Sequence, residues 1–544
     1  MDVSLAQIHE AISEAIPDRE CLIFRDRRLT FREVTERTRR LANYLIERGL
    51  GIRKERSELQ SWESGQDHLA IYLYNGNEYL EGMLGAYKAR VVPFNVNYRY
   101  VEEELIYLLK DAKSKGMIFH SEFAPTLDKI RAELPDLEVL IQVSDESGNA
   151  LLPGAVEYEA ALAGSSPEPP KVVPSPDDLY ILYTGGTTGM PKGVLWRQAD
   201  IFVTAMGGSR TDGSEYESID AIIEAAKGAG LRSLPAPPMM HGAAQWVAFL
   251  NWTGGNTVVM QNEVHRMDPD DVLSTAERHK ANGILIVGDA FARPILDQLR
   301  KKTYDLSELK LIASGGAVLA KGYKKEFLEL LPHVMILDAI GSSETGSQGR
   351  HLSTKTTGVD TGKFAPDPAT CVVSEDMTRV LPPGSEEVGW FAKRGRVPLG
   401  YLGDPEKTKQ TFPVIDGQTF SVPGDRAQIG ADGIIEVFGR DSATINSGGE
   451  KIFAEEVELA VKHHPSVYDV VVAGRPSELW GQEVVAIVQL REGVKTPESE
   501  LLEECSKHIA RYKHPKAFVF VEQVVRSPSG KADYRWAKER ASQG

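Results

Sequence analysis

One stretch of this chain, residues 183–193, constrains its fold more than any other. It reads Tyr183-Thr184-Gly185-Gly186-Thr187-Thr188-Gly189-Met190-Pro191-Lys192-Gly193. Apolar residues 179–183 lead into it and apolar residues 194–196 follow it, which predicts two strands joined by a loop. The glycines let backbone N–H groups approach an anion closely, the threonines add hydroxyl donors, and Lys192 adds a positive charge. The stretch therefore predicts a loop that holds a polyphosphate.

This loop differs from the two common phosphate-binding motifs. Pro191 precedes Lys192 and no Gly-Lys-Ser/Thr sequence opens a helix here, so the stretch is not the common P-loop. The pattern Gly185-Gly186-x-x-Gly189 also departs from the G-x-G-x-x-G of dinucleotide-binding folds. A glycine-rich hairpin turn that binds nothing is the alternative, and the motif alone leaves both interpretations open.

Length and charge narrow the classes of function. A chain of 544 residues is too long for one hydrophobic core, so we expect two or more domains. Its apolar fraction of 42% and charged fraction of 26% are typical of a soluble globular protein. The net charge of −16 argues against a nucleic-acid partner, because binding a phosphate backbone requires a basic surface.

Cysteine usage and the N-terminus predict the compartment. Cys21, Cys371 and Cys505 lie far apart without metal-ligand spacing, which favours reduced thiols in a cytoplasmic protein. The first residues lack the basic and apolar regions of a signal peptide, and no run of about 18 apolar residues occurs. We therefore expect a cytoplasmic protein without a transmembrane segment. Peripheral membrane contact and a homodimer remain open.

The order of apolar segments predicts the fold class. A strand over residues 68–73, a helix through residues 80–88 and a second strand over residues 91–100 indicate repeated α/β units and a largely parallel sheet. Five prolines between residues 165 and 176 predict a linker ahead of the phosphate loop. The charged segment 52–66 interrupts this pattern, and we expect it to be a solvated surface insertion or a divergent loop.

Two acidic residues follow turn-forming glycines further along the chain. Glu344, in Gly341-Ser342-Ser343-Glu344, is flanked by the hydroxyls that Mg²⁺ accepts as ligands beside a carboxylate. Asp425 follows Pro423-Gly424, and a carboxylate accepts hydrogen bonds from both hydroxyls of a vicinal diol. Without its neighbouring residues, Glu344 is better interpreted as a solvated loop acid. Without its neighbours, the default interpretation of Asp425 is a turn with an Asx hydrogen bond.

Taken in order, these stretches resemble the motifs of the adenylate-forming superfamily, which includes acyl-CoA synthetases, firefly luciferase and the adenylation domains of peptide synthetases. The resemblance covers nearly the whole chain. It implies an α/β fold with a large N-terminal domain of layered α/β subdomains, residues 1–439, and a small mobile α+β C-terminal domain, residues 440–544. The hinge is expected near residues 440–442, with Ser442 where the family usually has aspartate or lysine.

The resemblance assigns residues to ATP and Mg²⁺. It implies that Lys531, Lys192 and Glu344 are catalytic, that Lys531 contacts the carboxylate and the α-phosphate, and that Glu344 binds Mg²⁺ together with Thr184. Asp425 is expected to bind the ribose hydroxyls and Arg440 the ribose and phosphates. The other residues expected to bind ATP or AMP are Thr184, Gly185, Gly186, Thr187, Thr188, Gly189, Gly315, Gly316, Ala317, Gly341, Ser342 and Ser343.

The same resemblance assigns the acyl and coenzyme A sites. His241, Gly242 and Asp289 are expected to line the acyl pocket, although a lone histidine such as His241 is more often a packing or surface residue. The loop Ser447-Gly448-Gly449 is expected to line the pantetheine tunnel, where missing side chains let a thiol-bearing arm pass. Residues 400–408 resemble a family turn to which we assign no chemistry.

The implied activity is that of an AMP-forming acyl-CoA ligase. A fatty acid or steroid side-chain acid reacts with ATP to give an acyl-adenylate, and coenzyme A then forms the thioester; the chain most resembles actinobacterial fatty-acyl and steroid side-chain CoA ligases. Asp289 keeps open a stand-alone amino-acid or aryl-acid adenylating enzyme, since an acid can bind an ammonium group. A luciferase-like oxidase and a non-catalytic nucleotide- or lipid-binding module are further alternatives. Ile340 replaces the family's adenine-stacking aromatic residue, so adenine packing is expected to be aliphatic.

Overall fold

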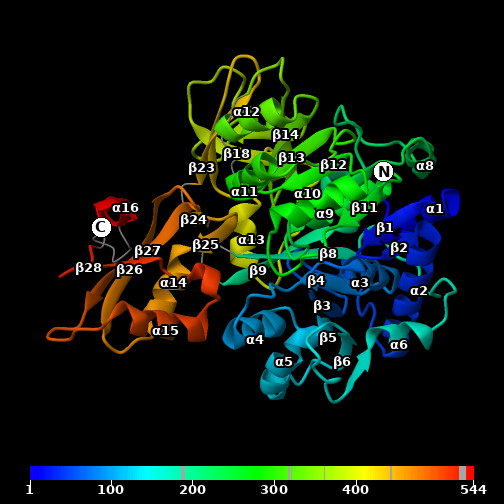
Figure 1. Cartoon of the computed structure of the whole chain (residues 1–544), viewed down its shortest axis with the longest axis horizontal. Helices are drawn as coiled ribbons and strands as arrows, with labels where there is room; N and C mark the ends of the chain where they lie inside the picture. The colour runs from blue at the N-terminus through cyan, green and yellow to red at the C-terminus, as the bar shows by residue number, and fades with distance from the viewer. Residues whose placement is uncertain are drawn as a thin grey trace. The chain divides into compact units, whose positions relative to one another are not determined.

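The computed structural model describes residues 1–185, 190–316, 319, 321–359, 362–440, 444–525 and 534–543 (Figure 1). Its contacts divide the chain into two compact units. The first unit contains Met1–Tyr98, Ala112–Tyr183 and Gly193–Gly439, and the second contains Arg99–Asp111, Thr184–Lys192 and Arg440–Gly544. The proposed hinge stays a prediction, because Ser442 lies outside the described residues.

The predicted parallel sheet is confirmed in the first unit. Five strands run in the order β4-β3-β5-β6-β7, and all neighbouring pairs are parallel. Every residue of β3 is buried, as expected for a strand covered on both faces. The bounds are β3 (His68–Tyr72), β4 (Val92–Asn95), β5 (Ser114–His120), β6 (Val139–Val143) and β7 (Ala155–Glu157), with α3 (Asn77–Lys88), α4 (Glu102–Asp111), α5 (Ala124–Ile130) and α6 (Tyr158–Ala163) between or after them in the chain.

A larger sheet contains most of the other strands of the first unit. In the described part its order is β2-β1-β11-β10-β12-β13-β14-β15-β16-β23-β22-β18-β21-β20, with β17 beside β18. Strands from β1 through β11, β10, β12 and β13 to β14 are parallel, and the pairing turns antiparallel at β15. The parallel part consists of β1 (Glu20–Phe24), β11 (Thr257–Met260), β10 (Arg232–Pro235), β12 (Gly283–Ile286), β13 (Leu311–Gly315) and β14 (Met335–Ser342).

Antiparallel strands complete this sheet. They are β2 (Arg27–Thr30), β15 (Gly346–Ser353), β16 (Lys363–Pro366), β17 (Thr370–Val373), β18 (Gly389–Arg394), β20 (Val414–Ile415), β21 (Gln418–Ser421), β22 (Asp425–Ile429) and β23 (Ile435–Arg440). The helices of this part of the chain are α1 (Leu5–Ala15), α2 (Phe31–Glu47), α7 (Gln198–Ala205), α8 (Ile219–Lys227), α9 (Gly242–Thr253), α10 (Pro269–Arg278), α11 (Gly288–Lys301), α12 (Lys321–Leu330) and α13 (Pro405–Thr411).

The helix α2 shows how local sequence starts an element. Thr30 and Glu33 form a capping box: the Thr30 Oγ1 accepts from the Glu33 N–H at 3.2 Å, and the Glu33 carboxylate accepts from the Thr30 N–H at 2.7 Å. The buried face of the helix then meets α3 at Gly85, where a Cβ would lie within 2.7 Å of the Leu41 side chain. Capping therefore starts α2, and a glycine contact lets it pack closely on α3.

A third sheet contains the two strands predicted around the phosphate loop. Strands β8 (Leu179–Gly185) and β9 (Pro191–Arg197) are neighbours, and β19 (Gly400–Tyr401) pairs with β9 on its other side. Residues 186–189, the centre of the loop, lie outside the described part. The strand–loop–strand prediction is thus confirmed for the strands.

The C-terminal part of the second unit is α+β. Its five described strands run β25-β24-β27-β26, with β28 parallel to β27. Alternate residues of β26 face two cores: Val470 and Val472 pack with α14 and α15, and Val471 and Ala473 pack with α16. The bounds are β24 (Thr444–Ser447), β25 (Glu450–Phe453), α14 (Ala454–Lys462), β26 (Val467–Ser477), β27 (Gly481–Leu490), α15 (Glu498–His508), β28 (Ala517–Phe520) and α16 (Tyr534–Gln543).

The charged segment 52–66 is a structured loop. A backbone bridge joins Ile52 to Gln66, and a 3₁₀ turn, η1 (Arg56–Glu58), lies between them. Arg90 contacts Glu55 and Asp178, both at 2.9 Å, and so ties the segment to the start of β8. Most charged residues of the segment are exposed, as expected for a surface insertion, and Glu55 is also paired with Arg90.

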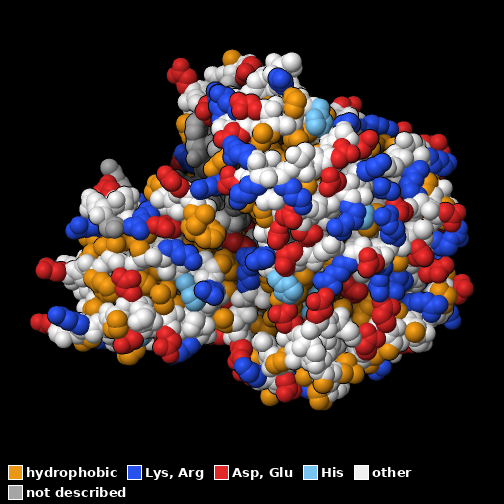
Figure 2. Space-filling model, in the orientation of Figure 1, with side chains coloured by type: hydrophobic (Ala, Val, Ile, Leu, Met, Phe, Trp, Pro, Cys, Tyr) orange, Lys and Arg blue, Asp and Glu red, His pale blue; other side chains and the backbone are white. Residues whose placement is uncertain are grey.

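The surface is charged, and the three cysteines lie in the interior. Acidic and basic side chains are interspersed over the face in view (Figure 2). Among the described residues, no helix combines the length and apolar character needed to cross a bilayer. Cys21, Cys371 and Cys505 are buried, and no disulfide joins them in the described structure.

We predict that Gly65→Ala destabilises the segment 52–66. A Cβ at Gly65 would lie 2.2 Å from the Lys54 carbonyl oxygen, a backbone atom that cannot move aside without opening the loop. The free energy of unfolding should fall by about 2 kcal/mol, in the range of overpacking substitutions. Hydrogen exchange over residues 52–66 should accelerate most.

The matched control is Gly322→Ala in α12, where an added Cβ meets nothing within 4 Å. This change should be neutral or slightly stabilising, because alanine is the better helix former. Equal stability of the two variants would contradict the prediction.

Candidate functional site

Four neighbouring strands place the expected substrate-binding residues at one edge of the large sheet. Strands β10, β12, β13 and β14 are adjacent and parallel, so their carboxyl ends lie at the same edge. The stretches that follow these ends contain His241 after β10, Asp289 after β12, Gly315 and Gly316 at β13, and Gly341 to Glu344 at β14. Ligands of open parallel sheets bind at such edges. The described fold therefore brings together four segments that are far apart in sequence.

The turn between β14 and β15 depends on two glycines. A Cβ at Gly341 would lie 2.2 Å from the carbonyl oxygen of Gly346. Gly346 has φ +64°, a conformation that strains other residues, and a Cβ there would meet the Thr204 hydroxyl at 2.9 Å. Both glycines are required for the chain to reverse this tightly. The reversal leaves Glu344 at the end of a parallel strand.

Three other elements hold Glu344. The Tyr401 hydroxyl donates to its Oε1 at 2.9 Å, and the Ser421 hydroxyl donates to its backbone carbonyl at 2.6 Å. The Trp196 indole N–H donates to the carbonyl of Ser343 at 2.8 Å. Glu344 is only 7% exposed. The carboxylate is thus held by Tyr401 of β19, and the backbone on which it sits is held by β9 and β21. Glu344 is not the solvated loop acid of the alternative interpretation.

The same turn carries an internal hydrogen-bond network. The Ser342 N–H donates to the Thr345 hydroxyl at 2.9 Å, and that hydroxyl lies 2.9 Å from the Gln348 side-chain oxygen. The Lys393 ammonium donates to the Ser347 carbonyl. Burial lowers the pKa of Lys393 to about 8, against an opposing effect of Asp367. These contacts constrain the turn through its own side chains and through Lys393.

A buried ion pair lies next to the strand that ends in Gly315, which with Gly316 is predicted to bind ATP or AMP. Lys324 and Asp338 lie 2.6 Å apart and are almost fully buried. Asp338 pairs in register with Ser314, whose hydroxyl accepts from the Gly288 N–H at 3.1 Å. Gly316 follows with φ +85°. The strands β13 and β14 therefore end in constrained backbone, although Ala317 lies outside the described residues.

The predicted acyl segment begins helix α9. His241 is its half-buried N-cap residue, and a Cβ at Gly242 would lie 2.6 Å from the Leu182 side chain of β8. Asn95 joins the two elements, because its amide donates to the Tyr183 carbonyl at 2.9 Å and to the Met240 carbonyl at 2.8 Å. Its oxygen accepts from the Tyr183 N–H at 2.8 Å. This buried asparagine fixes the end of β8 against the His241 segment.

Two further predicted segments have defined backbones. Asp425 is the half-buried first residue of β22, after Gly424 with φ +103°. Gly448 and Gly449 form the turn between β24 and β25 with φ values of +61° and +84°. The Trp480 ring covers this turn, since a Cβ at Gly448 would lie 2.9 Å from it. Side chains are therefore excluded from the turn predicted to line the pantetheine tunnel.

Comparison with known proteins identifies the family. A family model described as AMP-binding enzyme matches residues 10–401, and a model of the AMP-binding enzyme C-terminal domain matches residues 456–531. The chain belongs to the AMP-binding enzyme family. This confirms the predicted membership of the adenylate-forming superfamily.

Relatives of this AMP-binding enzyme are similar over nearly their whole length. It is 55% identical to the medium-chain acyl-CoA ligase Mig of Mycobacterium avium, over 99% of this chain and 98% of that protein. It is 40% identical to the 3-oxocholest-4-en-26-oate--CoA ligase of Rhodococcus rhodochrous, over 99% of this chain and 96% of that protein.

A solved structure confirms the fold class of this AMP-binding enzyme. The amide bond synthetase McbA from Marinactinospora thermotolerans matches with a TM-score of 0.78 and 19% identity, over 99% of each chain. At this identity the likeness concerns the fold alone. The α/β architecture with a large N-terminal and a small C-terminal domain is therefore confirmed.

Several predicted site residues of this AMP-binding enzyme are only partly described. Gly186, Thr187, Thr188, Gly189, Ala317, Ser442 and Lys531 lie outside the described residues. Gly185, Asp289 and Arg440 are described only as backbone positions in β8, α11 and β23, whereas Thr184 and Lys192 are half-buried residues of β8 and β9. Their roles stay predictions.

Sequence reasoning missed the residues that hold the site in place. Tyr401 lies in the stretch to which no chemistry was assigned, and it is 57 positions from the carboxylate that it contacts. The sequence gives one weak indication of the role of Asn95, which is a polar amide at the end of an otherwise apolar strand. Only the tertiary contacts reveal either role.

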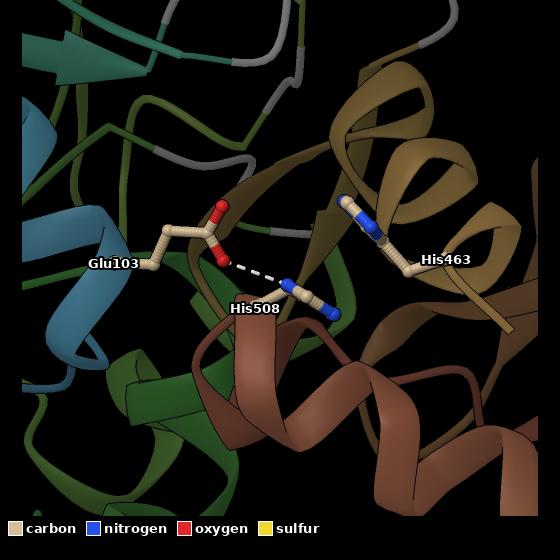
Figure 3. Close-up of side chains that lie close together, drawn as sticks. All are labelled: Glu103, His463 and His508. Carbon is tan, nitrogen blue, oxygen red and sulfur yellow. Dashed lines mark hydrogen bonds and ion pairs between the residues drawn. The ribbon is translucent and has the colours of Figure 1, made fainter.

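A cluster of ionisable side chains lies in the second unit (Figure 3). The Nδ1 of His508 contacts Glu103 at 2.7 Å, and its Nε2 contacts Glu504 at 2.9 Å. The rings of His463 and His508 are stacked 3.9 Å apart with 15° between their planes. A metal ion bound by both rings must lie near both ring planes, which this stacking prevents. Since ionised carboxylates only accept hydrogen bonds, both contacts are hydrogen bonds donated by His508 when its ring is protonated, so the geometry favours the imidazolium form.

We predict that the contacts of His508 with Glu103 and Glu504 make the free energy of unfolding depend on pH. Burial lowers the pKa of His508, but Glu504 and Glu103 raise it more, so its pKa lies above the usual value. The stabilisation is therefore present below pH 6.5 and is lost as pH rises through the raised pKa. His508→Gln should cost about 0.5 kcal/mol at pH 6 and nearly nothing at pH 9, measured by chemical denaturation.

His279→Gln is the control of opposite sign. Burial first, then the nearby arginines, lower the pKa of His279. Protonating this histidine therefore destabilises the folded chain, so the variant should gain stability relative to the wild type as pH falls below 6.5. A pH-independent difference for His508→Gln would contradict the imidazolium assignment.

Proposed function

We propose that this chain is an AMP-forming, ATP-dependent acyl-CoA ligase. The observation that carries the proposal is the 55% identity, over 99% of this chain, to a relative named as a medium-chain acyl-CoA ligase. The anchored Glu344 turn supports it, because nucleotide chemistry of this kind needs a carboxylate with a fixed position. The amino-acid or aryl-acid adenylating enzyme is not favoured, since the relatives at 55% and 40% identity are both named as CoA ligases.

The substrate class follows from the same relatives. We infer a medium-chain fatty acid as the first candidate, because the relative at 55% identity is named for one. A steroid side-chain acid is the second candidate, supported by the relative at 40% identity. ATP and coenzyme A are the co-substrates of either reaction. A homodimer remains a prediction from the sequence.

The donor set at the Glu344 turn fits Mg²⁺. Magnesium prefers a few hard oxygen ligands such as carboxylate and hydroxyl groups, and Glu344 offers a buried carboxylate. One carboxylate oxygen accepts from Tyr401, while the group keeps further acceptor capacity. Glu344, with Thr184, would hold the ion, which when bound would neutralise charge on the phosphate oxygens.

The first half-reaction forms the acyl-adenylate. A carboxylate oxygen of the acid attacks the α-phosphorus of ATP, and the bond to pyrophosphate breaks. Both reactants are anions, so the protein must neutralise charge and align them. Lys192, the loop N–H and hydroxyl groups and Lys531 are proposed to serve this purpose, and Asp425 and Arg440 to hold the ribose.

The second half-reaction forms the thioester. The sulfur of coenzyme A attacks the acyl carbon, the bond to AMP breaks, and the thiol proton is released. The turn at Gly448 and Gly449 is proposed to admit the pantetheine arm. His241 and Gly242 are proposed to line the acyl site, where Gly242 keeps the backbone against Leu182.

A panel of carboxylic acids tests the function. Purified full-length protein with Mg²⁺, ATP and coenzyme A should release AMP and form CoA thioesters, with medium-chain fatty acids turned over fastest. Thioester formation is measured by chromatography and AMP by a coupled assay. Absence of AMP release with every fatty acid and steroid acid in the panel would end the proposal.

Lys531→Ala tests the proposed catalytic lysine. Losing one charge-stabilising donor should slow adenylation about 100- to 1,000-fold. Thioester formation from supplied acyl-adenylate should persist, because the lysine is proposed to act only in the first step. Lys538→Ala, at an exposed position of α16, is the matched control and should leave both steps unchanged. Equal loss in both steps would refute the role.

A further inference from the structure

The strongest unassigned contact in the nucleotide region is the hydrogen bond from Tyr401 to Glu344. We propose that Tyr401 is a positioning residue that sets the affinity of the Glu344 carboxylate for Mg²⁺·ATP. The inference rests on the proposed function, and it gives a role to the stretch 400–408.

Tyr401 reaches the carboxylate through its hydroxyl and packs through its ring. The hydroxyl donates to the Oε1 of Glu344 at 2.9 Å. The residue is 5% exposed, and its ring packs on Phe412 with the ring centroids 5.7 Å apart. Removing the hydroxyl alone therefore keeps the packing and deletes the contact. A carboxylate that loses this donor regains rotational freedom in a site where only one orientation serves a metal ion.

The backbone of Tyr401 is fixed independently of Glu344. Its N–H donates to the Thr408 hydroxyl at 2.9 Å, and the preceding Gly400 has φ +158°. A Cβ at Gly400 would lie 2.5 Å from the Thr408 side chain, so only glycine lets this contact form. The first turn of α13 thus fixes the backbone of Tyr401 through a contact that does not involve Glu344.

The pairing with β9 sets the register of the tyrosine. Tyr401 lies opposite Val194 and Gly400 opposite Leu195. The Leu402 N–H donates to the Gly193 carbonyl at 2.8 Å and extends this pairing toward the start of the strand. Strand β9 also carries Trp196, whose indole N–H holds the Ser343 carbonyl. One strand therefore positions the turn of Glu344 twice, directly through Trp196 and through Tyr401.

The charged segment 52–66 contacts the turn that follows Tyr401. The Gly403 N–H donates to the carbonyl of Trp62 at 2.8 Å. Gly403 has φ +66°, the conformation that turns the chain away after Tyr401. The segment 52–66, which had no predicted role, is thus hydrogen-bonded to the turn after Tyr401.

The experiment compares Tyr401→Phe with Tyr158→Phe in the full-length protein. Tyr158 is a matched control, because its buried hydroxyl donates to the carboxylate of Glu81 at 2.8 Å. Steady-state pyrophosphate release gives the half-maximal Mg²⁺ concentration, the KM for ATP and the kcat at saturating Mg²⁺. Calorimetry in EDTA gives the metal-free affinity for AMP.

We expect Tyr401→Phe to raise the half-maximal Mg²⁺ concentration and the KM for ATP about tenfold, the factor for losing one hydrogen bond to a charged acceptor. The kcat at saturating Mg²⁺ and the metal-free binding of AMP should change less than about threefold. Tyr158→Phe should match the wild type in all of these quantities. A shift of AMP binding in EDTA equal to that of Mg²⁺ dependence would mean a general structural role and overturn the proposal, as would identical behaviour of the two variants.

A double-variant cycle gives a second test. If Tyr401 acts through Glu344, then adding Tyr401→Phe to Glu344→Ala causes no further loss of ATP binding measured with Mg²⁺. Additive losses would overturn the inference. A wild type and a Glu344→Ala protein with the same Mg²⁺ dependence would instead contradict the role of Glu344 in the proposed function, so the two failures are distinguishable.

Discussion

Parallel hydrogen bonding between β10, β12, β13 and β14 is the constraint on which the proposed nucleotide site depends. In a parallel sheet every carboxyl end lies at the same edge, so residues that follow different strands meet without any local signal between them. The spacing of these strands in the sequence is wide, because each pair needs a crossover of connecting chain. The site is consequently assembled from short segments, each of which is only a turn when taken alone.

The antiparallel strand β15 determines the path of the chain at the carboxyl end of β14. A crossover connection would lead the chain away from the edge, whereas the hairpin after β14 keeps Glu344 there and surrounds it with other strands. Trp196, Tyr401 and Ser421 approach the turn from three strands, and Lys393 binds its far side. Burying these polar groups is costly unless each has a partner, and here the partners belong to the turn itself. Such preorganisation suits a reaction whose barrier lies in bringing two anions together.

The second unit is held together differently. Its C-terminal sheet has apolar cores on both faces, yet the segment of α4 joins it through charges. Lys513 and Glu104 form a buried pair at 2.8 Å, and His508 contacts Glu103 nearby. Ion pairs respond to pH because their members titrate, whereas apolar contacts carry no titrating group. The stability of this segment is therefore the more sensitive to solution conditions.

The amino-acid sequence was enough to predict the family and the fold class, because stretches of glycines, hydroxyls and acids seldom recur in one family's order by chance. The roles that the same resemblance assigns to Glu344, Asp425 and the Gly448 turn stay predictions. The contacts of Tyr401 and Asn95 were not, since their partners lie at distant sequence positions and a tyrosine or an asparagine in a strand carries no mark of what it contacts. The charged segment 52–66 likewise reads as solvated until Arg90 is seen to bind it. These contacts came from the folded chain, because hydrogen-bond partners are chosen by the packing of whole strands and not by local sequence.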